Sequence, residues 1–206
     1  MMEVEITLKI TGKRPLMMHN PAGMGGGGGT QKVGKKEIPT PEVEAEAGAY
    51  RLPDGRLYLK SEMFHGSALK ACSGMKIGPA RGRKYAAKPI LAAALQYPET
   101  EVVLHDPEGG AALTSYVVDV RRAVVQQNGV LRARPRLDRW ECHLRIIYDD
   151  DLLTAENLVY IFSEAGKRIG VGDQRPGAPK TPGPFGTYMV ELMNGPPLPR
   201  GVQMAG

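Results

Sequence analysis

The residues with the clearest chemical potential are arginines, and they are clustered. Between positions 121 and 139 the chain carries Arg121, Arg122, Arg132, Arg134, Arg136 and Arg139. The planar arginine side chain can donate two parallel hydrogen bonds to one phosphate, so such a cluster is typical of phosphate binding. A solvated, charged surface is the alternative interpretation. The net charge of +5 and the pI of about 9.2 favour an anionic partner.

A second feature is a glycine-rich segment, residues 166–186, which reads RIGVGDQRPG from Arg168 and GPFGTY from Gly183. It differs from a Walker loop and from a dinucleotide fingerprint, because no Gly-Lys-Ser follows and the next expected element is a strand. Glycines let a phosphodiester approach the backbone closely, and an arginine adds charge. The alternative is a long turn. The candidate ligand contacts in this segment are Gly170, Gly172, Gln174, Arg175 and Gly186.

A third feature is the start of a predicted helix. Ser61 is the expected N-cap, and the helix is expected to run to about residue 73. Its sequence reads GSALK from Gly66. Helix N-termini present unpaired N–H groups to which a phosphate can bind, so Ser67 and Lys70 become candidate contacts. The alternative is an ordinary capped helix in which Gly66 serves close packing.

Two histidines allow a different chemistry. His19 follows the first predicted strand, and His65 lies in the predicted helix. Histidine titrates near neutral pH, so the two side chains could share the proton transfers of a metal-independent endoribonuclease. No metal or other cofactor is expected, because two distant cysteines, Cys72 and Cys142, and four scattered histidines form no recognisable ligand set. Both cysteines are expected to be reduced and buried.

The elements that must position these residues follow from hydrophobic periodicity. Residues 2–10 and 140–148 alternate apolar and polar side chains, which predicts two half-buried strands. A helix is expected between Thr154 as N-cap and Gly166 as its end. Further strands are predicted at 57–59, 102–105, 116–125, 130–136 and 185–193. Without insertions the order is strand, helix, strand, strand, helix, strand, which predicts one α+β domain over residues 1–206. Its core is expected to be ferredoxin-like, or like an RNA-recognition motif, with two helices on one face of an antiparallel sheet.

Two insertions interrupt this core. Residues 20–49 contain five consecutive glycines and several lysines and prolines, so we expect a long mobile loop that packs no core. Residues 116–136 form an expected β-hairpin that carries five of the six clustered arginines. Its turn is expected within Gln126-Gln127-Asn128-Gly129, because Asn-Gly is the strongest short hairpin signal.

In this combination and order, the chain resembles the RAMP superfamily, and within it the repeated backbone subunits of CRISPR effector complexes. The features that carry the resemblance are the opening strand, the long loop, the GSALK helix start, a hairpin similar to their "thumb", and the glycine-rich segment before the last strand. The resemblance implies a non-catalytic protein that binds guide RNA along its backbone and stacks head to tail into a helical filament. Ser67, Lys70, Arg121, Arg122, Arg132, Arg134, Arg136, Arg175 and the glycine-rich segment would be its RNA contacts.

Two departures from the family pattern limit what it implies. Target-cleaving members have an aspartate after the first strand, whereas this chain has none before Asp54. The aromatic signatures of RNA-recognition motifs are absent too, so bases are not expected to stack on the sheet.

Three other interpretations stay open: the endoribonuclease, a single-stranded DNA-binding phage protein, and a structural phage component. With no apolar run of about 18 residues and no secretory signal, we expect a cytoplasmic protein without a membrane span, able to join other effector subunits.

Overall fold

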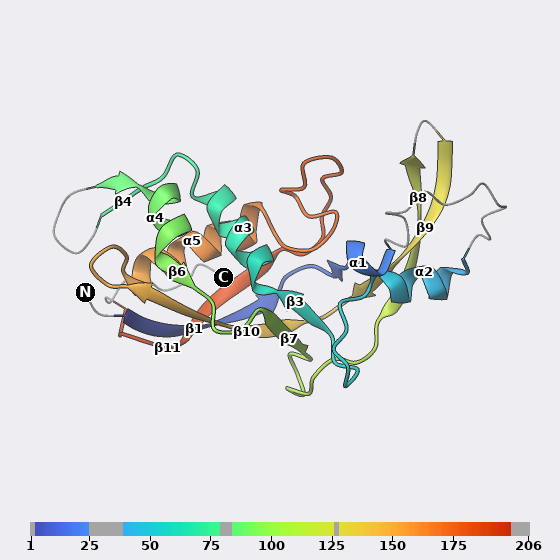
Figure 1. The fold of residues 1–206 in the computed structure, drawn as a ribbon, viewed down its shortest axis with the longest axis horizontal. Helices are drawn as coiled ribbons and strands as arrows, with labels where there is room; N and C mark the ends of the chain where they lie inside the picture. Colours follow the sequence, from blue (N-terminus) through green and yellow to red (C-terminus); the bar gives the residue numbers. More distant parts are fainter. Residues whose placement is uncertain (1–2, 25–38, 79–83, 126–127, 199–206) are drawn as a thin grey trace.

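The computed structural model describes residues 3–24, 39–78, 84–125 and 128–198, and its largest part is a six-stranded sheet (Figure 1). The strand order is β11-β1-β10-β7-β3, and β6 pairs with β10 outside this path. Every pairing in the sheet is antiparallel. The strands of this sheet are β1 (Glu3–Gly12), β3 (Tyr58–Lys60), β6 (Leu95–Gln96), β7 (Glu101–His105), β10 (Glu141–Asp149) and β11 (Tyr188–Asn194).

Helices cover one face of this sheet, as Figure 1 shows. They are α3 (Ser61–Ala71), α4 (Ala87–Ala94) and α5 (Ala155–Arg168), and a two-stranded sheet of β4 (Lys76–Ile77) and β5 (Tyr85–Ala86) lies between α3 and α4 in the chain. The predicted alternation in β1 and β10 supplies the buried face: Ile6, Leu8 and Ile10 are fully buried and lie opposite Ile146, Leu144 and Cys142. The core therefore lies between the sheet and α3 and α5.

Helix α5 confirms its predicted start and corrects its predicted end. Thr154 is the N-cap, and its hydroxyl accepts a hydrogen bond from the Asn157 N–H at 3.1 Å. The helix continues through Gly166 to Arg168. A Cβ on Gly166 would lie 2.3 Å from the Tyr188 carbonyl oxygen, so this glycine lets the helix approach β11. A glycine at this position predicts a helix end in sequence, because close packing and helix termination favour the same residue.

Helix α3 begins one residue earlier than expected. Ser61 is its first residue and is buried, and the N-cap is Lys60, which makes no capping hydrogen bond through its side chain. The Ser61 N–H instead donates to the Thr100 carbonyl oxygen at 2.9 Å. The sequence predicts that the Ser61 side chain caps the helix. In the structure, a backbone hydrogen bond to the chain before β7 satisfies the N–H at this helix end instead.

The structure also corrects the expected loop over residues 20–49. Within it lie α1 (Pro21–Met24) and α2 (Pro41–Gly48), while residues 25–38 fall outside the described residues. Helix α2 has Thr40 as N-cap, Pro41 in its first turn and buried residues Glu44, Ala45 and Gly48. Its start signals were readable in the sequence, but the neighbouring glycines and prolines obscured them.

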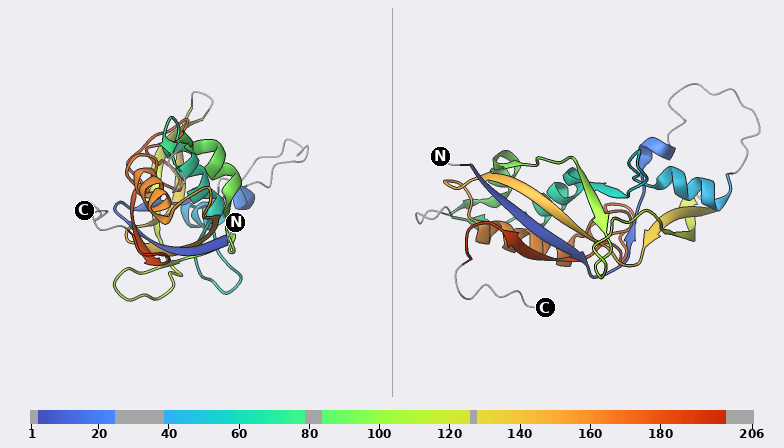
Figure 2. Two further views of the ribbon diagram at one scale, coloured as in Figure 1. Left: turned by 90° about the vertical axis from the view of Figure 1, so that its left-hand side faces the viewer. Right: turned by 90° about the horizontal axis from the view of Figure 1, so that it is seen from below.

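The predicted hairpin is present. Strands β8 (Val117–Val125) and β9 (Asn128–Leu137) pair antiparallel, and β2 (Leu16–Met17) joins the other side of β9. Asn128 and Gly129 lie in β9, opposite Val125 and Val124, so the Asn-Gly pair is part of the ladder and not its turn. The hairpin projects from one end of the molecule (Figures 1 and 2), and α2 packs against its base.

The fold is therefore α+β, with mainly antiparallel sheets. Among the described residues, the helices of at least eight residues are α2, α3, α4 and α5. A plain βαββαβ order is not evident in the chain, because short helices and strands stand between the expected elements. In the described parts of the chain, no helix has the length and apolar character needed to cross a membrane. Cys72 and Cys142 are unpaired and fully buried, as expected.

Candidate nucleic-acid interface

The glycine loop, residues 169–187 between α5 and β11, is held in a specific conformation by its glycines; residues 166–168 of the predicted segment belong to α5. Gly170, Gly172 and Gly186 have φ angles of 72°, 77° and 64°, in the left-handed region that glycine tolerates best. Gln174 is also left-handed, with φ of 48°. This is rare outside glycine and marks a locally strained backbone that the surrounding contacts must hold.

The glycines allow the loop to pack against the protein's own backbone. This corrects the prediction that they leave room for a phosphodiester. A Cβ on Gly186 would lie 1.8 Å from the Val171 carbonyl oxygen, and one on Gly172 would lie 2.6 Å from that of Met17. The space that was expected to admit a phosphodiester is therefore filled by the protein's own backbone. Hydrogen bonds hold the packing, with the Val171 N–H donating to Gly186 at 2.9 Å and the Asp173 N–H donating to Met17 at 2.7 Å.

The loop contacts the arginine-bearing hairpin at two points. The Arg134 guanidinium pairs with the Asp173 carboxylate at 2.8 Å. The Arg121 guanidinium carbon lies 4.6 Å from the centre of the Phe185 ring, a cation–π arrangement. Two segments that were predicted separately, about forty residues apart in sequence, are therefore joined into one surface.

The loop also contacts α3, which carries the third predicted segment. The Lys70 ammonium donates to the Gly177 carbonyl oxygen. Ser67 is placed differently from the prediction: it is 3% exposed and its side chain faces the core beside Tyr188. The Ser67 hydroxyl is therefore not available to a ligand at the surface. The GSALK helix start predicts a phosphate contact at this serine, but helical periodicity turns its side chain toward the core.

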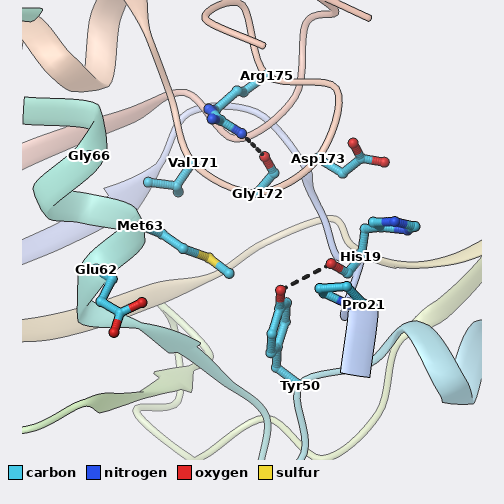
Figure 3. A pocket seen from close by; sticks show the side chains of 10 residues that line it. All are labelled: His19, Pro21, Tyr50, Glu62, Met63, Gly66, Val171, Gly172, Asp173 and Arg175. Carbon is cyan, nitrogen blue, oxygen red and sulfur yellow. Dashed lines mark hydrogen bonds between the residues drawn. The ribbon is translucent and has the colours of Figure 1, made fainter. Parts of the chain in front are cut away.

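A pocket of about 390 Å³ opens where the glycine loop meets α3 (Figure 3). Its residues come from the chain after β2, the chain before β3, the first turns of α3, and the glycine loop: His19, Pro21, Tyr50, Glu62, Met63, Gly66, Val171, Gly172, Asp173 and Arg175. In Figure 3, Met63 extends into the space between Gly172 and Tyr50. The Tyr50 hydroxyl donates to the His19 carbonyl oxygen at 3.0 Å, which holds one wall in place. The pocket combines apolar surface with charges of both signs.

Most hairpin arginines already have carboxylate partners. Arg121 and Arg136 both pair with Asp119, Arg136 also pairs with Asp138, and Arg132 pairs with Glu44 of α2 at 2.9 Å. Arg122 is exposed and has no side-chain partner among the described residues. Each paired guanidinium still has donors left over, because arginine has five N–H groups. Sequence alone did not reveal these pairs, since Glu44 and Asp173 are remote in the chain.

Asp119 is the centre of this charge network, and we predict a measurable role in stability. It is 8% exposed, and the hydrogen bond from Arg121, with a further one from Arg136, holds the pKa of its carboxyl below the usual range. Asp119→Asn should lower the free energy of unfolding by about 1–2 kcal/mol at pH 7, less than for a fully buried pair because both arginines are partly exposed.

The pH dependence of this effect has a definite sign. A carboxyl group whose pKa is lowered on folding stabilises the protein fully above its unfolded pKa of about 3.9, and this contribution is lost as the pH falls through the folded pKa. The free energies of unfolding of wild type and Asp119→Asn, measured with urea, should therefore differ at pH 7 and converge as the pH falls through the lowered pKa of Asp119. The control, Asp138→Asn, alters a half-exposed partner of Arg136 and should have little effect. Equal effects of the two changes would contradict the central role of Asp119.

The two histidines proposed for acid–base chemistry lie in different places. His19 is exposed and lines the pocket. His65 is not among the pocket residues; its Nδ1 lies 3.0 Å from the Tyr97 hydroxyl, and burial lowers the pKa of its ring. Two acidic residues line the pocket with His19: Glu62, and Asp173 of the glycine loop, to which the sequence motif assigns no role of its own.

Sequence analysis also missed Tyr50, Glu62 and Met63 as pocket residues. Glu62 and Met63 stand beside the predicted helix start, so a fuller reading of that helix face would have included them. Tyr50 had no readable signal, because it lies within a region of unassigned structure. Elsewhere, in the parts of the chain that are described, the one cluster of potential metal ligands is Asp149, Asp150 and Asp151, at the end of β10 and in the turn that follows it.

No protein-family model matches the chain, and no curated protein matches it significantly. The interpretation of the site therefore depends on its geometry and on the sequence motifs.

Proposed function

We propose that this protein binds single-stranded nucleic acid, with RNA as the first candidate, along its phosphate backbone and with little sequence preference. The observation that carries the proposal is that the glycine loop contacts the hairpin through Arg134–Asp173 and α3 through Lys70–Gly177, beside a pocket that the loop and α3 help to line. Three segments selected independently for phosphate binding belong to one continuous region. The proposed contacts are Lys70, Arg121, Arg122, Arg132, Arg134, Arg136, Gln174 and Arg175.

The topology supports a relationship to the RAMP superfamily. We propose that β1, α3, β7, β10, α5 and β11 form a ferredoxin-like core into which the other elements are inserted. The four strands of this core lie in the sheet order β11-β1-β10-β7, and all neighbours are antiparallel. Numbered one to four along the chain, this order is four, one, three, two. This is the arrangement that two βαβ crossovers with helices on one face produce. Helices α3 and α5 do pack against each other.

The charge arrangement supports binding to a polyanion. A phosphate that approaches the hairpin meets Arg122 without displacing a carboxylate, and it meets Arg121 and Arg136 at their free N–H groups. Asp119 holds these two guanidinium groups close together, so the entropy of ordering them is lost on folding and not on binding. By contrast, Glu62 and Asp173 at the pocket disfavour a phosphate inside it, and a neutral part of the ligand, such as a base or sugar, suits that space better.

We further propose head-to-tail self-association along the nucleic acid, as in the family resembled, with the possibility of other effector subunits joining. The projecting hairpin supports this, because a contact between one protomer's hairpin and a different surface of the next is heterologous, and a heterologous contact that does not close into a ring propagates as a helix. We place the activity in the cytoplasm, since two buried, unpaired cysteines fit a reducing compartment.

One observation favours a second candidate function. His19 and Asp173 line the same pocket, so a metal-independent endoribonuclease could use that histidine as a general base oriented by a carboxylate. Incubation of the protein with labelled RNA in the presence of EDTA separates the two functions. Intact RNA supports the binder, whereas defined fragments that disappear with His19→Ala would establish the enzyme.

The binding proposal is tested by the salt dependence of affinity. Fluorescence anisotropy with labelled single-stranded RNAs of unrelated sequence should give similar Kd values, and affinity should fall more than about tenfold between about 50 and 200 mM salt. Arg122→Ala and Arg175→Ala should each weaken binding and flatten the salt dependence. Arg56→Ala, at an exposed arginine in the turn before β3, is the control. Salt-independent binding, or binding to one sequence alone, would overturn the proposal.

A further inference from the structure

In the part of the chain that the structure describes, the outer edge of β8 is unpaired. The order in the three-stranded sheet is β2-β9-β8, so β8 has a described neighbour on one side and none on the other. Its sequence, VVDVRRAVV, is rich in β-branched residues and contains neither proline nor glycine. A long edge strand of this kind is a template for pairing with another strand. The base of the hairpin is covered by α2, but Val117 and Val120 of β8 remain 46% exposed.

Two hydrogen bonds on β9 determine which groups of β8 face this free edge. The Ala133 N–H donates to the Glu44 carboxylate at 3.1 Å, and the Pro135 carbonyl oxygen accepts from the Met18 N–H at 2.9 Å. Both groups therefore point away from β8. In an antiparallel pair, residues opposite such positions also point their N–H and C=O groups away from the partner strand.

The register then identifies the outward-pointing residues of β8. Ala133 lies opposite Val120, and Pro135 lies opposite Val118, so the N–H and C=O groups of Val118 and Val120 point to the free edge. Every second residue of a strand points its backbone groups to the same edge, so those of Arg122 point there too. Pro135 fits this pattern, since it lacks an N–H at a position where the ladder with β8 needs none. Among the described residues, no backbone hydrogen bond from a loop or another element reaches these three.

This edge is complementary to itself. If a second copy of β8 pairs antiparallel with Val120 opposite Val120, the outward N–H and C=O groups of the two strands meet as hydrogen-bonded pairs. Asp119 of each copy then lies opposite Arg121 of the other, in the non-hydrogen-bonded positions where side chains approach most closely. The ion pair that Asp119 and Arg121 form within one chain would thus continue across the junction. A register centred on Arg122 would instead oppose two like charges.

The apolar side chains agree with this register. Val120 is 46% exposed, and Leu131, which lies opposite Arg122 on the same face of the hairpin, is 71% exposed. In the paired arrangement the two Val120 side chains are neighbours on this face, with Leu131 of each copy one strand further out. The pairing therefore covers apolar surface on one face and matches opposite charges on the other.

We propose that two copies of this protein pair through the edges of their β8 strands, centred on Val120, to give a twofold dimer when no nucleic acid is bound. The contact is isologous and closed, and so it is distinct from the head-to-tail contact proposed above. Arg121 and Arg122 belong to the same strand, so nucleic acid and the second copy compete for it. Adding nucleic acid would then dissociate the dimer.

Proline substitution tests the proposal without disturbing the hairpin. Because the Val120 N–H points outward, Val120→Pro in both copies removes the two hydrogen bonds of the central Val120–Val120 pair and none from the pairing with β9. The control, Val120→Thr, keeps the N–H and the β-branched shape. Light scattering on nuclease-treated protein at micromolar concentration should give a dimer for wild type and Val120→Thr, and a monomer for Val120→Pro. A monomeric wild type, or a dimeric Val120→Pro, would overturn the proposal.

Crosslinking provides a second, independent measurement. Cys72 and Cys142 are fully buried, so a cysteine introduced at the hairpin is the reactive one. A short bifunctional thiol reagent should crosslink Val120→Cys into dimers, because the paired Cβ atoms would lie about 5.5 Å apart. Leu131→Cys, separated by further strands, should give few dimers. RNA binding by the monomeric Val120→Pro protein tests the proposed function separately, and the two proposals can therefore fail independently.

Discussion

Gly186→Ala is expected to lower the free energy of unfolding by about 3 kcal/mol or more. The added Cβ would lie 1.8 Å from the Val171 carbonyl oxygen, so the backbone of the glycine loop must move. The φ angle of 64° adds a conformational cost of about 1–2 kcal/mol for any residue with a side chain. Displacing the loop would also disturb the Asp173–Arg134 pair, and with it the packing of the hairpin.

Gly110 provides a matched control for this change. Its φ angle is 65°, but nothing lies within 4 Å of an added Cβ. Gly110→Ala should therefore show the conformational cost alone, about 1–2 kcal/mol. Urea denaturation of both variants and wild type separates backbone conformation from steric overlap. Equal destabilisation by the two changes would show that the loop yields easily and that the close contact with Val171 does not hold its shape.

The second large effect is expected on binding, from filling the pocket. Gly66 lines the pocket, lies within α3, and has nothing within 4 Å of an added Cβ. Gly66→Leu should therefore fold normally and gain up to about 1 kcal/mol in stability, since leucine is the better helix former. Its side chain would occupy space that we assign to the ligand, so affinity for single-stranded RNA should fall about tenfold or more, which corresponds to about 1.4 kcal/mol.

Gly66→Ala is the control for this experiment. It brings the same gain in helix propensity but adds only a methyl group, so its Kd should stay close to that of wild type. Thermal unfolding confirms that both variants are folded, and anisotropy titrations with the same RNA give the Kd values. Unchanged affinity for Gly66→Leu would show that the ligand does not enter the pocket, and would restrict the interface to the hairpin arginines.

The sequence by itself determined the elements whose signal is local. The alternation over residues 2–10 and 140–148 predicted β1 and β10, because a strand with one buried face must repeat every two residues. Thr154 with the apolar stripe that follows predicted the start of α5. The two flanking strands and an Asn-Gly pair predicted the hairpin of β8 and β9, although Asn128 and Gly129 lie in the ladder and not in the turn. Each of these elements can be predicted from residues that lie within a few positions of one another in the sequence.

The tertiary structure decided what the individual functional candidates can do. Ser67 faces the core, Gly166 lies inside a helix, and the glycines of the loop contact their own protein, although each was a reasonable surface or stop signal in sequence. Glu44 and Asp173 neutralise hairpin arginines that are remote in the chain. The physical reason is that burial and ion pairing depend on which elements pack together. That packing is set by the whole apolar core, and no window of sequence contains it.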